Sequence, residues 1–527
     1  MRTFIALAVC AALGCGLLGS VHADEGPEFG APNLPTGDKP FVDDAWIAEA
    51  LAAAGDNASQ LQQVLDYFTE HKRIAARFLI GHMIGKGYIV TELQDAKGNV
   101  IEFDPLAYPN FEASRDAIEA LEKKHGSLEF KREKKVEDLK TITAAYLKKH
   151  INRSVDTWMR RPKDKRVSFK AFLHYVLPYR GSQEPIDDWL DPLLRRYAGR
   201  AEKHLDGEKL DELYTWLKKD IGKRVRFNPR YYLHPTDQGF TEMGRSGMGR
   251  CEDITNMQTY AARALSLATA ADYTPYWGRG DNNHAWNVLL NKEGIGFTPA
   301  YSHAAKVYRK TYAIQRDSLP FDLPEGREAP NRFMASTTAV DVTDQYGPTT
   351  DVTVKVGANA TGEKHAYLCV FNGGTWKAIQ WGRIQDGSVT FDRMGRNIVY
   401  LPAIHDGTKL VATAAPRFVA KDGSITELAG SGEATSVLAV AVRPKRKNVD
   451  TLVEKPVSYL AEGTVYVLKR WDTTKAAWHI VGGGTAGTEP MTFEKLPADG
   501  LYWLVPKESR RLERPWTITA EGRQLFW

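Results

Sequence analysis

The stretch Gly247-Met-Gly-Arg-Cys-Glu-Asp-Ile-Thr-Asn-Met257 largely determines which fold this chain of 527 residues is expected to adopt. From Cys251 to Leu265, apolar residues recur at three- and four-residue steps, without proline or interior glycine. This spacing predicts an amphipathic helix of about four turns that begins at the cysteine. A thiol at a helix N-terminus is a candidate nucleophile, because the helix dipole and a nearby imidazolium both lower the pKa of a cysteine.

A candidate base follows, with His284 placed 33 residues after Cys251. Residues 273–277 and 284–290 are predicted to form two strands joined by a polar turn. Strand alternation places His284 and Trp286 on the same face. A cysteine before a helix, or a histidine near a tryptophan, is more often structural than catalytic when it occurs alone. Together, the thiol and the imidazole match the requirement of nucleophilic catalysis.

Two acids follow the cysteine directly. Glu252 and Asp253 suit the positive end of the helix dipole, but carboxylates close to the thiol would raise its pKa. We therefore expect both side chains to point away from Cys251, toward backbone donors. Gly247 and Gly249 permit close approach of the backbone, and an N–H group near the cysteine would serve as an oxyanion hole.

The N-terminus predicts export. Residues 1–23 have a basic start, an apolar run and small residues before the expected cut, as in a secretory signal peptide, and residues 24–40 are expected to be a mobile lead-in. The mature protein is therefore expected to be periplasmic or secreted. A lipoprotein anchored at Cys15 is the alternative, although Ala12 departs from the lipoprotein pattern. The apolar run is too short to span a bilayer, so no integral membrane segment is expected once the signal is removed.

Removal of this leader leaves Cys251 and Cys369 as the only cysteines. Cys369 lies in an apolar run that predicts a strand, where cysteine usually acts as a small buried hydrophobe. A disulfide between the two is disfavoured, because they lie in segments that look like different domains. Cys251 is therefore expected to remain a free thiol.

Hydrophobic periodicity divides the rest of the chain. Helical spacing dominates the first part, where the charged run 131–135 is interpreted as a solvated helix face, and strand alternation dominates after Tyr312. The basic run 443–447 is interpreted as a linker. The expected order is a helical domain at 41–165, a core of mixed helices and strands at 166–325, a β-sandwich domain at 335–442 and a C-terminal β domain at 450–527.

These motifs resemble the transglutaminase-like superfamily of papain-type cysteine enzymes, and the layout is similar to that of large exported multi-domain bacterial members. The resemblance covers residues 169–312. It rests on Gly249-Arg-Cys-Glu-Asp253, the helix that follows, the strand Asp272-Tyr-Thr-Pro-Tyr-Trp277, and Asn283-His-Ala-Trp-Asn287. It implies an α+β fold with a transglutaminase-like core. In that core, Cys251 is the nucleophile and His284 is the general base and then the acid of an acyl transfer at an amide.

The third catalytic residue of the family is usually an aspartate on the strand after the histidine strand. The resemblance puts Thr298 at that position, so the orienting carboxylate is missing there. Asn287 is the other candidate, because amides serve this role in papain-like enzymes, although alternation places it on the face opposite His284. The residues expected to line the cleft are Trp277, Trp286, Asn283, Gly249 and Arg250.

The expected function is that of an exported thiol enzyme acting on amide bonds of a peptide, a protein or a peptidoglycan stem peptide. Hydrolysis is favoured over transamidation, because an amine must outcompete water inside a shielded cleft. The alternative is a catalytically silent scaffold whose β modules bind glycan or protein. The tryptophans near the C-terminus would support that alternative if exposed, but core packing explains most of them more simply.

Other classes are disfavoured by composition. The formal net charge is +5, and acidic and basic residues are interleaved, so no nucleic-acid partner is expected. The chain has no glycine fingerprint of a nucleotide site beside a suitable strand and helix, so no cofactor is expected. No second histidine lies near His284 at ligand spacing, which leaves no candidate metal site.

Overall fold

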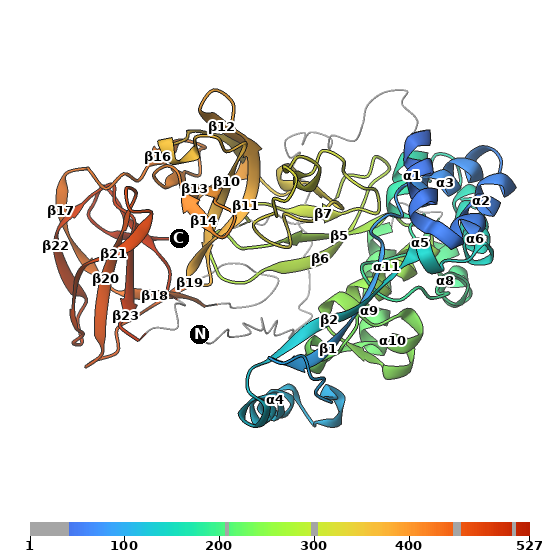
Figure 1. Cartoon of the computed structure of the whole chain (residues 1–527), viewed down its shortest axis with the longest axis horizontal. Helices are drawn as coiled ribbons and strands as arrows, with labels where there is room; N and C mark the ends of the chain where they lie inside the picture. Colours follow the sequence, from blue (N-terminus) through green and yellow to red (C-terminus); the bar gives the residue numbers. More distant parts are fainter. Residues whose placement is uncertain (1–41, 206–209, 297–303, 446–454, 509–512) are drawn as a thin grey trace.

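The computed structural model describes residues 42–205, 210–296, 304–445, 455–508 and 513–527. It consists of N-terminal helices, a central antiparallel sheet packed against helices, and two β-rich units at the C-terminal end (Figure 1). The α+β class is therefore correct at the level of mixed helices and antiparallel sheets. The predicted signal peptide and lead-in lie outside the described residues. Within the described part of the chain, no helix is both long and apolar enough to cross a bilayer.

The N-terminal helices each bury one apolar face against the others. Leu61, Phe78, Leu147 and Phe172 are fully buried in their common core. The hydroxyl of Thr143 caps the first turn of α6, which satisfies an N–H group that the helix itself cannot. The bounds are α1 (Asp44–Ala54), α2 (Ala58–Tyr67), α3 (Glu70–Gly81), α5 (Asp138–Thr141), α6 (Ala144–Arg160) and α7 (Phe169–Tyr175).

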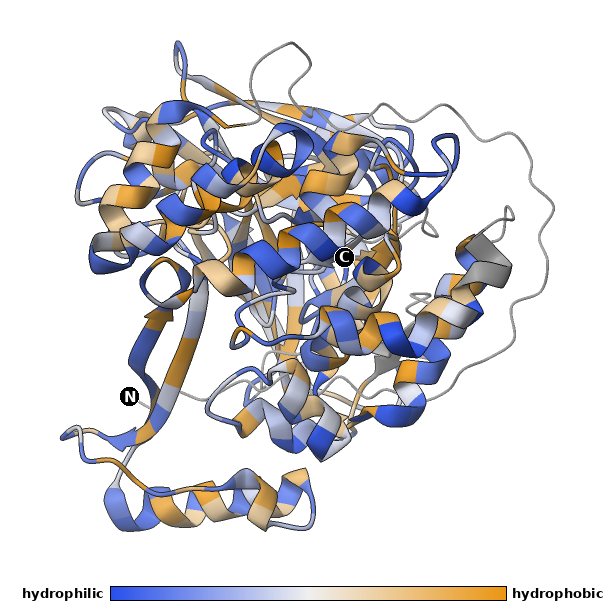
Figure 2. Cartoon of the chain, turned by 90° about the vertical axis from the view of Figure 1, so that its right-hand side faces the viewer, coloured by the Kyte–Doolittle hydropathy of each residue, from blue (hydrophilic) through white to orange (hydrophobic). Residues whose placement is uncertain are grey.

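The predicted helix over residues 131–135 is wrong. These residues lie in β2 (Leu128–Glu137), which pairs antiparallel with β1 (Gly87–Asp95), and α4 (Phe111–His125) lies between the two strands in the chain. The run is mostly exposed, as expected for charged residues, but it has no apolar stripe that a helix could bury. Residues 131–135 therefore pair with β1 as a strand and do not form a helix. The hairpin and α4, here named the arm (residues 87–137), project from the body (Figures 1 and 2).

The central region packs a helix against a four-stranded sheet of order β6-β5-β7-β8. The predicted helix from Cys251 is confirmed, and the predicted strand over residues 284–290 is confirmed as β6. The strand expected at 273–277 is β5, displaced toward the N-terminus, because Pro275 has no N–H group to continue the ladder. The bounds are α8 (Leu190–Leu205), α9 (Leu210–Arg224), α11 (Cys251–Ala264), β5 (Thr269–Thr274), β6 (His284–Leu289), β7 (Tyr308–Lys310) and β8 (Ala339–Asp341).

The C-terminal half consists of antiparallel strands, as the alternation predicts. The first β unit contains a sheet of order β11-β10-β13-β15-β16 and the pair β12-β9, and the second contains a sheet of order β21-β20-β23-β24-β25. Strands of the first unit are β9 (Thr349–Lys355), β10 (His365–Asn372), β11 (Thr375–Arg383), β12 (Ser388–Gly395), β13 (Ile398–His405), β14 (Leu410–Ala412), β15 (Arg417–Val419) and β16 (Ile425–Glu427). Strands of the second sheet are β20 (Val465–Asp472), β21 (Ala477–Thr485), β23 (Tyr502–Pro506), β24 (Trp516–Ile518) and β25 (Gln524–Phe526).

The linker interpretation is wrong for residues 443–445. These residues lie in β18 (Ala441–Lys445), which pairs with β19 (Lys455–Tyr459), while β17 (Ala434–Ala439) pairs with β22 (Met491–Pro497). The second β unit therefore recruits strands from about ten residues before the expected linker. Composition cannot reveal the pairing of β17 with β22, because even their nearest paired residues, Ala439 and Met491, are far apart in the chain.

The aromatic residues of the C-terminal region form a core that both β units share. Phe371 of the first unit contacts Trp478 and Trp503 of the second, with ring centroids 5.8 and 5.0 Å apart. Four of the five tryptophans that end the chain are buried, which confirms that packing explains most of them: Trp471, Trp503, Trp516 and Trp527. Cys369 is fully buried, as expected, and burial raises the pKa of its thiol.

A buried ion pair joins the strands of the central sheet. Arg309 of β7 donates from Nε and Nη2 to the two carboxylate oxygens of Asp272 on β5, each at 2.8 Å, and neither residue is exposed. Arg309 also donates to the Gly294 carbonyl and to Gln345, so its guanidinium is well supplied with acceptors. Such a pair is stable only with this many hydrogen bonds, because both charges have left water.

Replacing Asp272 by alanine should therefore leave the Arg309 charge buried without its partner. We expect Asp272→Ala to lower the free energy of unfolding by about 3–5 kcal/mol. Urea titration followed by near-UV circular dichroism measures the change. Arg523→Ala, which removes an exposed pair with Glu521, should change it by less than about 1 kcal/mol. Equal losses in the two variants would contradict the central role of the buried pair.

Candidate functional site

Cys251 is exposed at the first position of α11, and the chain before it is held tightly. Gly247 ends α10 (Phe240–Ser246) with φ 60°, in the left-handed region that glycine favours. The short strand β4 (Met248–Gly249) then pairs with β3 (Arg226–Phe227). A Cβ atom on Gly249 would lie only 2.7 Å from Cβ of Asp253, so glycine is needed for this close approach.

The two acids behind the cysteine are engaged elsewhere. Asp253 accepts hydrogen bonds from the backbone N–H groups of Arg250 and Gln238, as predicted for a carboxylate turned toward backbone donors. Glu252 instead accepts from Lys310 of β7 at 2.5 Å and from the Ser182 hydroxyl at 2.6 Å. The Lys310 ammonium holds the pKa of Glu252 at about 2. The negative charges of Glu252 and Asp253, which lie beside the thiol, are therefore compensated.

Arg250 adds a positive charge next to Cys251. Its guanidinium donates to Asp237, and both side chains are half-buried. Burial raises the pKa of Asp237 to about 6, although Arg250 opposes the shift. The start of α11 therefore combines the positive end of the helix dipole with two cations, Arg250 and Lys310, each of which has a carboxylate partner.

His284 lies at the same end of the helix–strand pair as Cys251. The amide of Asn287 on β6 donates to the Thr255 carbonyl of α11 at 2.9 Å, which fixes the relative position of strand and helix. Leu289, farther along β6, pairs with Thr269, which follows the C-terminus of α11, so β6 runs parallel to the helix. From the Asn287 contact, His284 lies about 10 Å along the strand and Cys251 about 6 Å along the helix, in the same direction.

The surface between these two positions is open. Ala285 follows His284 and lies on the face of β6 that Asn287 presents to α11, yet Ala285 and Asn283 are exposed. The helix therefore does not cover the start of the strand. Cys251 is likewise exposed.

Aromatic rings surround the histidine. The His284 ring is half-buried and contacts the rings of Trp286 and Trp277, with centroids 5.3 and 6.3 Å away. Trp286 donates to the hydroxyl of Tyr346 at 2.9 Å, and Tyr346 in turn donates to Asp272 at 2.6 Å. The buried ion pair of the sheet is thereby connected to the ring beside His284.

Asn287, one of the two candidates for the third catalytic residue, makes its hydrogen bonds to α11 and not to His284. Asn287 uses its amide N–H groups on α11, where it donates to Thr255 and also to Gln258 at 3.2 Å. Thr298 lies outside the described residues. Asp272, on the neighbouring strand, is committed to Arg309 and Tyr346.

Tyr232 is a site residue that sequence reasoning missed. Its hydroxyl lies 3.4 Å from Cys251 Sγ, and it follows Tyr231 in the short helix η3 (Pro229–Leu233). The arm holds this segment, because Arg230 donates to two carbonyls of the arm, and Phe111 and Ile118 of α4 pack on Leu233. Nothing in the local sequence pattern of this segment indicates that the arm would fix it.

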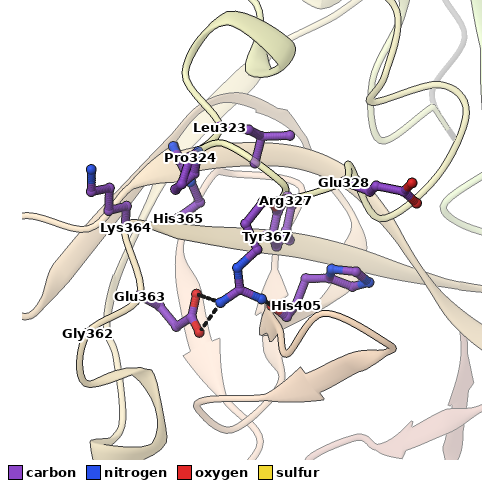
Figure 3. A pocket seen from close by; sticks show the side chains of 10 residues that line it. All are labelled: Leu323, Pro324, Arg327, Glu328, Gly362, Glu363, Lys364, His365, Tyr367 and His405. Carbon is purple, nitrogen blue, oxygen red and sulfur yellow. Dashed lines mark hydrogen bonds and ion pairs between the residues drawn. The ribbon is translucent and has the colours of Figure 1, made fainter.

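Two hollows in the described residues are lined by neither Cys251 nor His284. A pocket of about 90 Å³ at the edge of the first β unit is drawn in Figure 3, where Arg327 makes two hydrogen bonds to the carboxylate of Glu363. The charges of Arg327 and Glu363 compensate each other. A larger groove of about 640 Å³ runs between β8 and strands β11 and β12, with Trp381 and Phe333 in its wall. In the described part of the chain, no three His, Cys, Asp or Glu side chains converge to hold a metal ion.

Comparison with known proteins adds no assignment. No protein-family model, no curated protein and no solved structure matches the chain. The site is therefore interpreted from its own geometry.

Removing the Tyr232 hydroxyl should weaken the stabilisation of a thiolate at Cys251. A hydrogen bond to a charged group contributes about 1.5–3 kcal/mol, so in Tyr232→Phe we expect the inflection of the pH profile of iodoacetamide labelling to move upward by about one pH unit. Labelling of Cys251 is followed by mass spectrometry. Tyr67→Phe, at an exposed tyrosine of α2, should leave the profile unchanged. An unchanged profile in Tyr232→Phe would show that the hydroxyl does not act on the sulfur.

The pair Glu252–Lys310 should contribute stability with a defined pH dependence. Because the folded-state pKa of Glu252 is depressed to about 2, its contribution is present above the unfolded pKa of about 4.3 and is lost as the pH falls toward 2. Glu252→Gln should therefore be less stable than wild type at pH 7, by on the order of 1 kcal/mol for this partly exposed pair. Urea midpoints at pH 7, 5 and 3 test this, and a difference that grows toward pH 3 would contradict it.

Proposed function

We propose that the chain is an exported transglutaminase-like cysteine enzyme that cleaves amide bonds by acyl transfer, most readily to water. The observation that carries this proposal is the placement of an exposed thiol at the start of α11 and an imidazole at the adjoining start of β6, beside open surface. Nucleophilic catalysis by cysteine requires a thiol and an imidazole within hydrogen-bond reach, and we propose that these two groups meet during the reaction.

The proposed reaction has two steps. Cys251 Sγ attacks the carbonyl carbon of the amide, and the C–N bond breaks as protonated His284 donates its proton to the leaving amine, which leaves a thioester. Neutral His284 then takes a proton from water, whose oxygen attacks the thioester carbon. The products are a carboxylic acid and the free thiol, with the proton returned to the pair.

Two groups are suited to stabilise the negative oxygen formed in each step. N–H groups in the first turn of α11 have no carbonyl partner within the helix and lie at the positive end of its dipole. The Tyr232 hydroxyl lies 3.4 Å from the sulfur, within reach of an oxygen on the carbon bonded to it. Removing one such donor costs about 100- to 1000-fold in rate in known cases.

We assign part of the role of the third catalytic residue to the aromatic surroundings of the histidine. A cation over the face of a tryptophan is stabilised by about 0.5–2 kcal/mol, and the Trp286 ring centroid is 5.3 Å from that of His284. The hydrogen bond from Trp286 to Tyr346 restricts the indole ring. The rings thus limit the rotation of the imidazole, although more weakly than a carboxylate would.

Exposure of the thiol supports hydrolysis over transamidation. Water reaches Cys251 directly, so an amine would have to compete with bulk solvent for the thioester. An open site also suits a long substrate, and we propose a peptide, a protein or a peptidoglycan stem peptide. The glycan-binding scaffold is the weaker alternative, because four of the five tryptophans on which it depends are buried.

The reactivity of Cys251 tests the proposal without knowledge of the substrate. We expect iodoacetamide to label Cys251 of the wild type rapidly at pH 6, and His284→Ala to slow this reaction about 10-fold or more, because the imidazolium no longer favours the thiolate. Cys251→Ala is the control that identifies the labelled residue, since Cys369 is buried. A thiol of ordinary reactivity that His284→Ala does not alter would refute the proposed pair.

Amide cleavage is tested with the full chain on peptide mixtures and peptidoglycan stem peptides in H₂¹⁸O. New carboxylates carrying ¹⁸O, identified by mass spectrometry, indicate hydrolysis, and we expect His284→Ala to reduce their rate on the order of 100-fold. Binding of glycans or peptides by Cys251→Ala and wild type alike, with no cleavage, would favour the scaffold instead.

A further inference from the structure

The loop of residues 278–283 connects the buried Trp277 to His284 and is held by side chains of both β units. Trp277 N–H donates to the Asn282 carbonyl at 3.1 Å, which closes the loop on itself. A shift of this loop would move both ends, and therefore the indole ring that contacts His284 as well as the backbone of His284. The loop thus controls where the imidazole lies.

Asn372, the last residue of β10, binds the loop through its side chain. Its Nδ2 group donates to the carbonyls of Trp277, Gly280 and Asn282 at 3.0–3.2 Å, and its Oδ1 accepts from the Asn282 N–H at 3.2 Å. The residue is 5% exposed. Asn282 has φ 67°, a conformation that costs free energy outside glycine and persists only where neighbours impose it. Asn372 makes hydrogen bonds with both backbone polar groups of this residue.

Arg514, from the second β unit, binds the same loop from another direction. Its Nη1 group forms an ion pair with Asp281 at 3.1 Å and donates to the Gly280 carbonyl at 3.3 Å, and Nη2 donates to the Gly278 carbonyl at 3.4 Å. Arg514 is 3% exposed and also donates to the carbonyl of Trp527. A charged group so deeply buried fixes its acceptors, because each lost hydrogen bond is costly there.

The loop also packs directly on the first β unit. A Cβ atom on Gly278 would lie 2.5 Å from the side chain of Ile398 on β13, so the backbone approaches this strand more closely than any other residue permits. Asp281 accepts from the Gly373 N–H at 2.8 Å, in the turn that follows β10. Backbone groups of the loop, and not only its side chains, are therefore specified by the β units.

We propose that Asn372 and Arg514 are positioning residues for His284, so that the two β units complete the candidate active site. This inference rests on the proposed function. A displacement of about 1 Å in a reacting group can cost about 100-fold in rate, which is sufficient reason to hold the loop from two sides. It also gives the β units a role other than binding glycan.

The test compares iodoacetamide labelling of Cys251 across pH in full-length Asn372→Ala, Arg514→Ala and wild type. A rise of one pH unit in the inflection lowers the thiolate fraction below it about 10-fold, and we expect labelling at pH 6 to slow by about that factor in each variant. Asp281→Asn, which removes only the charge facing Arg514, is a milder variant and should shift the profile in the same direction. Unchanged profiles in all three folded variants would overturn the proposal.

The control for a merely structural effect is Lys306→Met. Lys306 is fully buried and joins the central region to the first β unit by donating to Asp341 and to the carbonyl of Arg393, but it does not contact the loop. We expect Lys306→Met to lower the melting temperature while the pH profile of labelling stays that of wild type. A shift as large as that of Asn372→Ala would mean that loss of stability alone explains the effect, and would overturn the proposal.

Hydrogen–deuterium exchange separates this inference from the proposed function. Peptides covering residues 278–284 should exchange faster in Asn372→Ala and Arg514→Ala than in wild type, but not in Lys306→Met. If wild-type Cys251 has ordinary reactivity, the enzymatic proposal and the catalytic meaning of the loop both fail, whereas the exchange data still show whether the loop is held as inferred. If Cys251 is reactive and exchange does not change, only the positioning proposal fails.

Discussion

Two opposite charges that have no access to water, Asp272 and Arg309, restrict the central region to one arrangement. Because neither can be solvated, each needs all of its hydrogen-bond partners within the protein, and these come from β5, β7, the Gly294 carbonyl and the segment around Gln345. Any shift between these elements would leave a buried charge incompletely compensated. Tyr346 extends the constraint toward Trp286 and hence toward the ring of His284.

Buried polar groups also fix the loop that precedes His284. Arg514 and Asn372 are buried polar groups, and their acceptors are backbone atoms of the loop before His284. Cys251 is fixed differently, by a helix start whose carboxylates are compensated by backbone N–H groups and by Lys310. Polar groups that cannot turn to solvent therefore hold the loop before His284, while the thiol of Cys251 remains accessible.

The sequence predicts best those parts of the structure in which residue types recur at a regular local spacing. The helix from Cys251 and the strand from His284 follow from spacing within a few residues, and the burial of the C-terminal tryptophans follows from residue type. The strands over residues 131–135 and 441–445 do not, because each is defined by a partner strand, β1 or β19, that carries no complementary signature in the sequence. Tyr232 was missed for the same reason, since its position depends on the arm.

A sequence motif and a catalytic site carry different information, as the missing third residue of the motif shows. A motif specifies a residue type at one position, whereas an imidazole needs only that something restrict its rotation and stabilise its charge. The carboxylate on the strand beside β6, Asp272, is already committed to Arg309, and Asn287 is committed to α11. In the proposed enzyme, restriction of the imidazole comes from Trp286 and from the loop held by Asn372, which no alignment to a catalytic triad would select.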